Sequence, residues 1–119
     1  MNVAQLEAIF DGIEHYLQEC FSSTPNMTIM TKSFKIRRQS HIENYVEMVI
    51  SKGRSQFRMH AYTNESCAVA NYFDLVHHAY DQKQQLSFDM SDPQFLDQVT
   101  KAVQNWIDGR PLWKMPVVP

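Results

Sequence analysis

The sequence predicts an α+β fold in which helices pack on one face of an antiparallel β-meander of three to four strands, in the order α-β-β-β-α-β-α. Two observations predict this fold. Apolar and polar residues alternate through 41–51 and 54–62, which is the pattern of two paired strands with one buried face. Near both ends of the chain, apolar residues instead recur every three or four positions, as in amphipathic helices.

The first helix is expected over residues 3–21. It ends before Pro25, because a proline disfavours helical geometry in the residue that precedes it. Its buried stripe is made of apolar residues at helical spacing, which are Val3, Leu6, Ile9, Phe10, Ile13, Leu17, Cys20 and Phe21.

The first predicted strand covers residues 27–38, with Met30, Phe34 and Ile36 on one face. A three-residue loop of Gln39-Ser40-His41 would place Phe34 opposite Val46 and Arg37 opposite Glu43. A two-residue loop would instead set Ile36 against Glu43. The opposite charges of Arg37 and Glu43 favour the three-residue loop.

The next two strands, 42–51 and 54–62, form a hairpin whose register is well specified. A shift of one residue would turn its apolar side chains toward water. Lys52-Gly53 is the expected two-residue connection. The expected pairs are Met48 with Phe57 and Val46 with Met59 on the apolar face, and Glu47 with Arg58 and Tyr45 with His60 on the outer face.

Two further elements are predicted after this hairpin. Apolar residues at helical spacing indicate a helix over 67–83, although its β-branched and aromatic residues would also suit a strand. The alternation in 84–90 indicates a short fourth strand. The residues that define the helix are Val69, Tyr72, Phe73, Val76, Ala79 and Tyr80, and those that define the strand are Leu86, Phe88 and Met90.

The last helix begins after Ser91-Asp92-Pro93-Gln94 and ends at Gly109. Its apolar stripe contains Phe95, Leu96, Val99, Val103, Trp106 and Ile107. These elements predict one α+β domain over residues 1–110. Residues 111–119 form an apolar, proline-rich tail, expected to lie extended across the domain or across a partner.

Composition indicates a cytoplasmic protein without a membrane segment. The chain has 119 residues and a net charge of −2, so no global field attracts nucleic acid or anionic lipid. Its two cysteines, Cys20 and Cys67, are expected to be reduced thiols. The first residues lack the basic and apolar regions of a signal peptide. The apolar stripes suffice for a monomer and are compatible with a homodimer.

No catalytic, cofactor or metal motif occurs in the chain, which favours a protein without a cofactor. One alternative is a small-ligand or enzymatic pocket near Cys67 and His77. Cys67 would lie at a helix start, where the dipole stabilises a thiolate, and His77 could pair with it. A small, inert cysteine is the commoner situation.

The outer sheet face provides the best functional signal. Aromatic residues with a charged rim are typical of protein-interaction surfaces, and this face together with the tail offers Tyr45, Arg58, His60, Tyr62 and Trp113. The sequence therefore predicts a small non-catalytic module that binds a protein partner, as accessory, inhibitor, immunity or chaperone-like proteins do. The second alternative is nucleic-acid binding through the basic strand 32–38, against which the slightly acidic chain argues.

Overall fold

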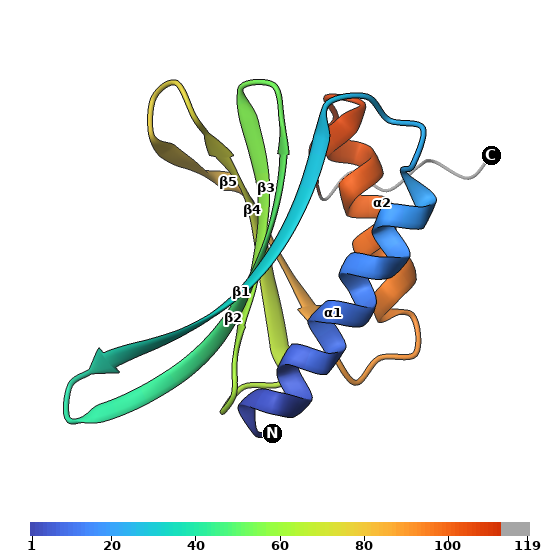
Figure 1. Ribbon diagram of the computed structural model, residues 1–119. Helices are drawn as coiled ribbons and strands as arrows, with labels where there is room; N and C mark the ends of the chain where they lie inside the picture. Colours follow the sequence, from blue (N-terminus) through green and yellow to red (C-terminus); the bar gives the residue numbers. More distant parts are fainter. Residues whose placement is uncertain (113–119) are drawn as a thin grey trace.

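A computed structural model describes residues 1–112, apart from the side chains of Arg38 and Gln82. Within these residues, two helices flank five consecutive strands (Figure 1). The elements are α1 (Val3–Cys20), β1 (Met27–Arg38), β2 (His41–Lys52), β3 (Ser55–Tyr62), β4 (Cys67–Asp74), β5 (Ala79–Asp89) and α2 (Phe95–Ile107).

The predicted α+β class with an antiparallel sheet is confirmed. The sheet has the order β1-β2-β3-β4-β5, so within the described part of the chain each strand pairs with its neighbours in the sequence. Both helices lie on the same face of the sheet, and no helix among residues 1–112 covers the other face (Figure 1). The buried core lies between the two layers and includes Leu6, Phe10, Leu17, Val46, Met48, Ile50, Phe57, Met59, Val99, Val103 and Trp106.

The predicted helix over 67–83 is wrong, because this segment forms β4, a turn and the first part of β5. In β4, Ala68 and Ala70 point into the core and Val69 lies between them, which is the alternation of a strand. Pairing with β3 continues without a shift along β4, so Tyr72 keeps the face of Ala70, whereas Val69 and Phe73 lie on the outer face. Apolar residues on both faces of β4 produced the spacing that resembled a helix. The predicted strand over 84–90 is the second half of β5.

The β2–β3 hairpin has the predicted faces but a register shifted by two residues. Its connection is Gly53-Arg54, one position later than predicted, and Met48 therefore lies opposite Met59 instead of Phe57. The backbone of Gly53 has φ +60°, which a two-residue hairpin loop requires and which glycine adopts without strain. Because the shift is even, each side chain keeps its predicted face.

The β1–β2 connection is Gln39-Ser40, so the predicted three-residue loop is wrong. Ile36 lies opposite Glu43, and Met30 and Phe34 consequently occupy the outer face of the sheet. The prediction relied on a solvent-exposed Arg37–Glu43 pair, which would contribute under about 1 kcal/mol. The shorter loop instead packs Ile29, which is partly buried, against the core opposite Ile50, and each buried CH₂ group contributes about 0.8 kcal/mol.

The segment after α2 packs against the domain as far as residue 112, the last residue that the structure describes. Leu112 is only 1% exposed and belongs to the core. Its backbone N–H donates to Oε1 of Gln84 at 3.1 Å, and its carbonyl accepts from Nδ2 of Asn105 at 3.3 Å. The hydroxyl of Tyr72 also donates to the carbonyl of Arg110 at 2.8 Å. Residues 113–119, and with them Trp113, lie outside the described residues.

Candidate binding surface

The face of the sheet opposite the helices carries four aromatic rings in mutual contact, here called the ring cluster: Phe34, Tyr45, His60 and Tyr62. Tyr45 lies at the centre, with its ring centroid 5.0 Å from Phe34 and 5.4 Å from Tyr62. His60 makes edge contacts with Tyr45 at 6.4 Å and with Tyr62 at 5.7 Å. The structure thus brings together three of the five residues that the sequence predicted for this surface.

Phe34 was not among the residues predicted for this surface, because the longer loop would have placed it on the core side. Its ring is nearly parallel to that of Tyr45, at an interplanar angle of 18°, and it is 37% exposed. Met30, on the same face, is 53% exposed. The alternation within β1 shows which side chains share a face. It does not show which of the two faces is buried, because a change of one residue in the length of the β1–β2 loop exchanges the faces.

Arg58, the fourth predicted residue, is held in a fixed orientation beside the ring cluster. Its Nε donates to Oε1 of Gln56 at 2.8 Å, and its Nη1 donates to the hydroxyl of Tyr80 at 3.0 Å. The guanidinium lies 4.2 Å from the ring centroid of Phe73. The predicted pairing of Arg58 with Glu47 is wrong, because the register sets Glu47 opposite His60.

Two shallow hollows mark the outer face. One, of about 230 Å³, is lined by Tyr45, Glu47, His60, Tyr62, Asn71 and Tyr80. The other, of about 260 Å³, lies among residues of β1, β2 and β3 that include Lys32, Phe34 and Arg58. Sites for small molecules usually enclose about 300–1,000 Å³. The outer face is therefore better suited to a macromolecular surface than to an enclosed ligand.

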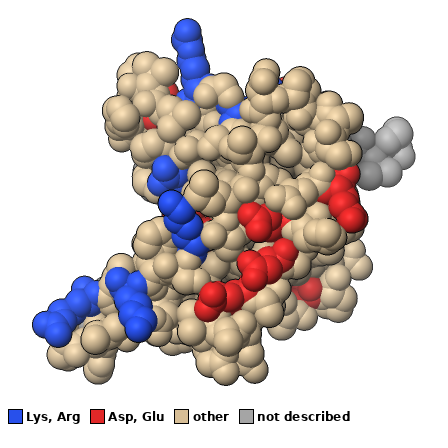
Figure 2. All heavy atoms as spheres, viewed as in Figure 1, with Lys and Arg blue, Asp and Glu red and all other residues tan. Residues whose placement is uncertain are grey.

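The basic residues of β1 do not form one platform with the rings. Lys32 shares the outer face with Phe34, whereas Lys35 and Arg37 alternate with them and lie on the side of the helices. The space-filling view shows the Lys and Arg side chains spread along the strands and the hairpin end (Figure 2). This division weakens the interpretation of strand 32–38 as a nucleic-acid platform with stacking rings.

Burial lowers the pKa of His60, and the carboxylates of Glu47 and Glu65 partly offset that effect. In the unfolded chain His60 binds its proton near its ordinary pKa of about 6.5, whereas the folded protein binds it only at lower pH. The contribution of His60 to stability is therefore fully present above about pH 6.5 and declines below it.

The free energy of unfolding of the wild type should fall between about pH 7 and pH 5, because the unfolded chain binds a proton at His60 more readily than the folded protein does. We expect a smaller fall in His60→Gln, which has no titrating group at this position. Urea unfolding at several pH values measures the effect. His15→Gln, on the exposed side of α1, is the control and should leave the His60 contribution in place. An unchanged pH dependence in His60→Gln would contradict the expectation.

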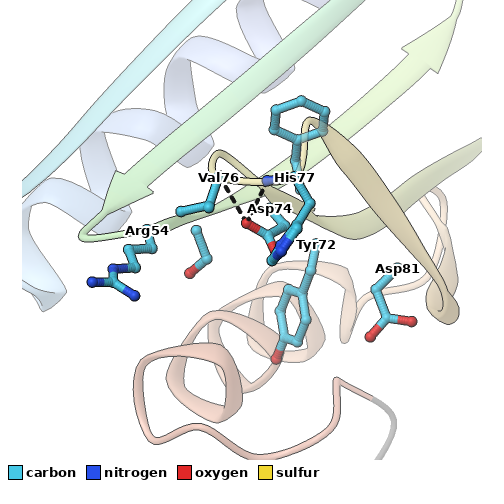
Figure 3. Close-up of a pocket in the computed structure, with 8 residues that line it drawn as sticks. Arg54, Tyr72, Asp74, Val76, His77 and Asp81 are labelled. Atoms are coloured by element: carbon cyan, nitrogen blue, oxygen red, sulfur yellow. Dashed lines mark hydrogen bonds and ion pairs between the residues drawn. The ribbon is translucent and has the colours of Figure 1, made fainter.

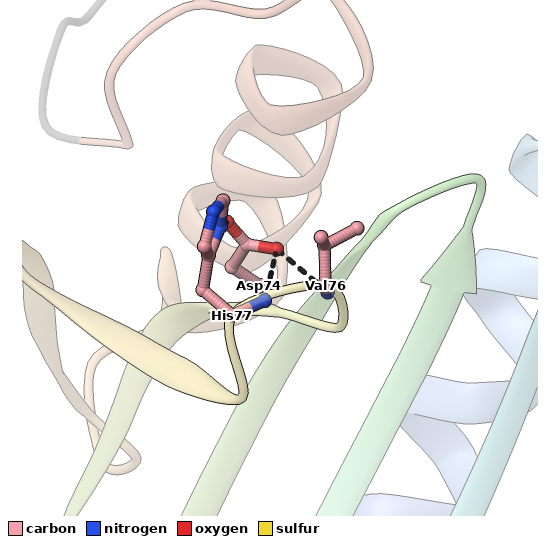
Figure 4. Close-up of polar contacts among 3 residues, drawn as sticks. All are labelled: Asp74, Val76 and His77. Atoms are coloured by element: carbon pink, nitrogen blue, oxygen red, sulfur yellow. Dashed lines mark hydrogen bonds and ion pairs between the residues drawn. The ribbon is translucent and has the colours of Figure 1, made fainter.

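A pocket of about 380 Å³ lies at the turn between β4 and β5 (Figure 3). Oδ1 of Asp74 accepts the backbone N–H groups of Val76 and His77, at 2.8 and 3.2 Å, and Oδ2 lies 2.7 Å from Nδ1 of His77 (Figure 4). The hydrogen bond from the His77 side chain is the main reason that the pKa of Asp74 is lowered. These contacts are those of a side-chain-stabilised turn.

The structure does not bring Cys67 and His77 together. Cys67 begins β4, opposite Asp89, whereas His77 follows the other end of that strand. The hydroxyl of Ser55, also in the His77 pocket, accepts from Nε1 of Trp106 at 3.0 Å. Within residues 1–112 no three His, Cys, Asp or Glu side chains are placed to hold a metal ion. No helix in this range is long and apolar enough to cross a membrane.

Comparison of the chain with protein-family models, with curated proteins and with solved structures found no match.

Proposed function

We propose that this protein is a small non-catalytic binding module that holds a protein partner on the outer face of its sheet. The observation that carries the proposal is the ring cluster, which lies half-exposed on a face that neither helix covers. In the accessory, inhibitor, immunity or chaperone-like roles that fit such a module, binding itself is the activity.

The chemistry of this face supports a protein as the ligand. Tyrosine and arginine supply a large share of the binding energy in protein interfaces. Arg58 is already oriented by Gln56 and Tyr80, so little of its conformational freedom remains to be lost on binding. The two cysteines are free thiols, which supports a reducing compartment such as the cytoplasm.

Replacing Tyr45 and Tyr62 together by alanine is expected to abolish capture of the partner and to leave the domain folded. Both side chains are half-buried on the outer face, outside the core between the layers. The measurement is quantitative affinity capture from the native host with the wild-type protein and the variant. Interface residues of this type each contribute about 2 kcal/mol or more, so the expected loss exceeds tenfold.

Tyr16→Ala provides a matched control, because Tyr16 is 41% exposed on α1, in the helical layer. This variant should capture the same partner as the wild type. Equal capture by all three proteins would contradict the proposal. Unfolding of Tyr45→Ala/Tyr62→Ala would also contradict it, because the outer face would then be part of the core.

A ligand site in the pocket at the β4–β5 turn is the second candidate, supported by the contact between Asp74 and His77. This contact orients the imidazole and could leave its Nε2 available to a ligand. In that case His77→Gln, and not the double tyrosine variant, would abolish function.

A further inference from the structure

Charges of opposite sign are segregated between the first two elements of the fold. α1 contains four carboxylates and neither lysine nor arginine. β1 contains four basic residues and neither aspartate nor glutamate. Glu7, Asp11 and Glu14 recur at spacings of four and three, which places them on one side of α1.

The basic residues continue into the end of the β1–β2 hairpin, here called the arm (residues 33–44). The arm projects beyond the helical layer (Figure 1). Ser33 pairs with Val46 on the core side, so the same alternation places Lys35 and Arg37 on the helix side, past the end of the core. Both are exposed, and Ile42, opposite Arg37, is 65% exposed.

These two charged sets are not paired within one molecule. Among the described residues, Glu7, Asp11 and Glu14 form no ion pair, and neither do Lys35 and Arg37. The space-filling view shows acidic atoms over α1 and basic atoms at the end of the arm on the same side of the molecule (Figure 2). One side therefore carries two neighbouring patches of opposite charge.

We propose that the chain forms a two-fold dimer in which the arm of each copy lies against the acidic side of α1 in the other. A two-fold axis between the patches places each basic patch on an acidic one, and does so twice. A polyanion would pair only with the arm, whereas a second copy pairs with both patches. The exposed Ile42 would be covered in the same contact.

This dimer leaves the ring cluster accessible, because the arm would use the face of the sheet opposite Phe34 and Tyr45. The inference is therefore independent of the proposed function. Its failure would leave the outer face as a binding surface, and loss of partner binding there would leave the dimer intact.

The test is sedimentation velocity of the full-length chain at several protein concentrations. We expect a dimer at about 0.02 M salt that weakens at about 0.5 M, where screening is strong. Lys35→Glu/Arg37→Glu should raise the dimer dissociation constant at least about tenfold, and so should Glu7→Lys/Asp11→Lys/Glu14→Lys. Lys83→Glu/Arg110→Glu, which makes the same change of charge away from the arm, should dimerise as the wild type does.

Mixing the two charge-reversed variants provides the decisive measurement. Each variant repels itself, but the reversed arm of one matches the reversed helix of the other, so the mixture should form a heterodimer.

Wild-type protein that stays monomeric up to about 0.1 mM at low salt would overturn the inference, because a dimer with a micromolar dissociation constant would be largely formed at that concentration. A dimer insensitive to reversal, or a mixture that stays monomeric, would also overturn it. Lys35→Gln/Arg37→Gln, which should weaken dimerisation less than reversal, provides a second test if a reversed chain does not fold.

Discussion

Replacing Phe57 by alanine is expected to lower the free energy of unfolding by about 3–5 kcal/mol. Phe57 is fully buried on β3, opposite Ile50 on β2. Its ring lies 6.2 Å from that of Trp106, and it therefore joins the sheet to α2. Alanine would remove this contact and leave a cavity between the layers that the backbone can close only in part.

The same substitution at Phe34 is the matched control for Phe57→Ala. Phe34 is 37% exposed and stacks mainly on Tyr45, so its loss should cost about 1 kcal/mol. Urea unfolding of both variants measures the difference. Two similar losses would contradict the observed β1 register, because they would place Phe34 on the core side, opposite Val46, as the longer loop requires.

Leu112→Ala is expected to lower the free energy of unfolding by about 2–5 kcal/mol. The side chain is 1% exposed, and the backbone around it is hydrogen-bonded to Gln84 and Asn105. The segment after α2 thus closes the end of the core beside β5. Truncation of residues 111–119 removes Leu112 as well, so it should destabilise the domain at least as much as the point substitution does.

Val76→Ala is the control for Leu112→Ala. Val76 is 55% exposed in the turn between β4 and β5, and a substitution there should change the stability by no more than about 0.5 kcal/mol. Thermal or urea unfolding measures both variants. If Leu112→Ala had as small an effect as Val76→Ala, the folded domain would end at residue 110, as predicted from the sequence.

The sequence correctly predicted the parts of the fold in which the apolar residues keep a single spacing, either alternate or helical, without interruption. Residues 41–62 alternate throughout, and their two strands and two faces are as predicted. In β4 apolar residues occupy both faces of the strand, with Ala70 and Tyr72 on one face and Val69 and Phe73 on the other, and the resulting intervals also fit a helix. Pairing with β3 decides between the two structures, and a local pattern does not contain that information.

The sequence could predict those residues of the candidate surface whose place depends only on the face of the strand that they occupy. It could not predict those whose place depends on the length of a loop. Tyr45, His60 and Tyr62 keep their common face under any even shift of register, and they meet in the ring cluster. Phe34 depends on the length of a turn. The contacts of Arg58 depend on Tyr80, which the sequence assigned to a helix. Trp113 stays a prediction.

The meander topology has a consequence for how the chain folds during synthesis. Because strands adjacent in the sheet are also adjacent in the chain, each strand can pair with its predecessor soon after it leaves the ribosome, and such local contacts favour rapid folding. The apolar face of this sheet, however, receives Trp106 only with the last helix. Because α1 packs mainly against β1 and β2, we expect a nascent chain that ends before α2 to expose the rest of the hydrophobic face, which is the stage at which chaperones would engage it.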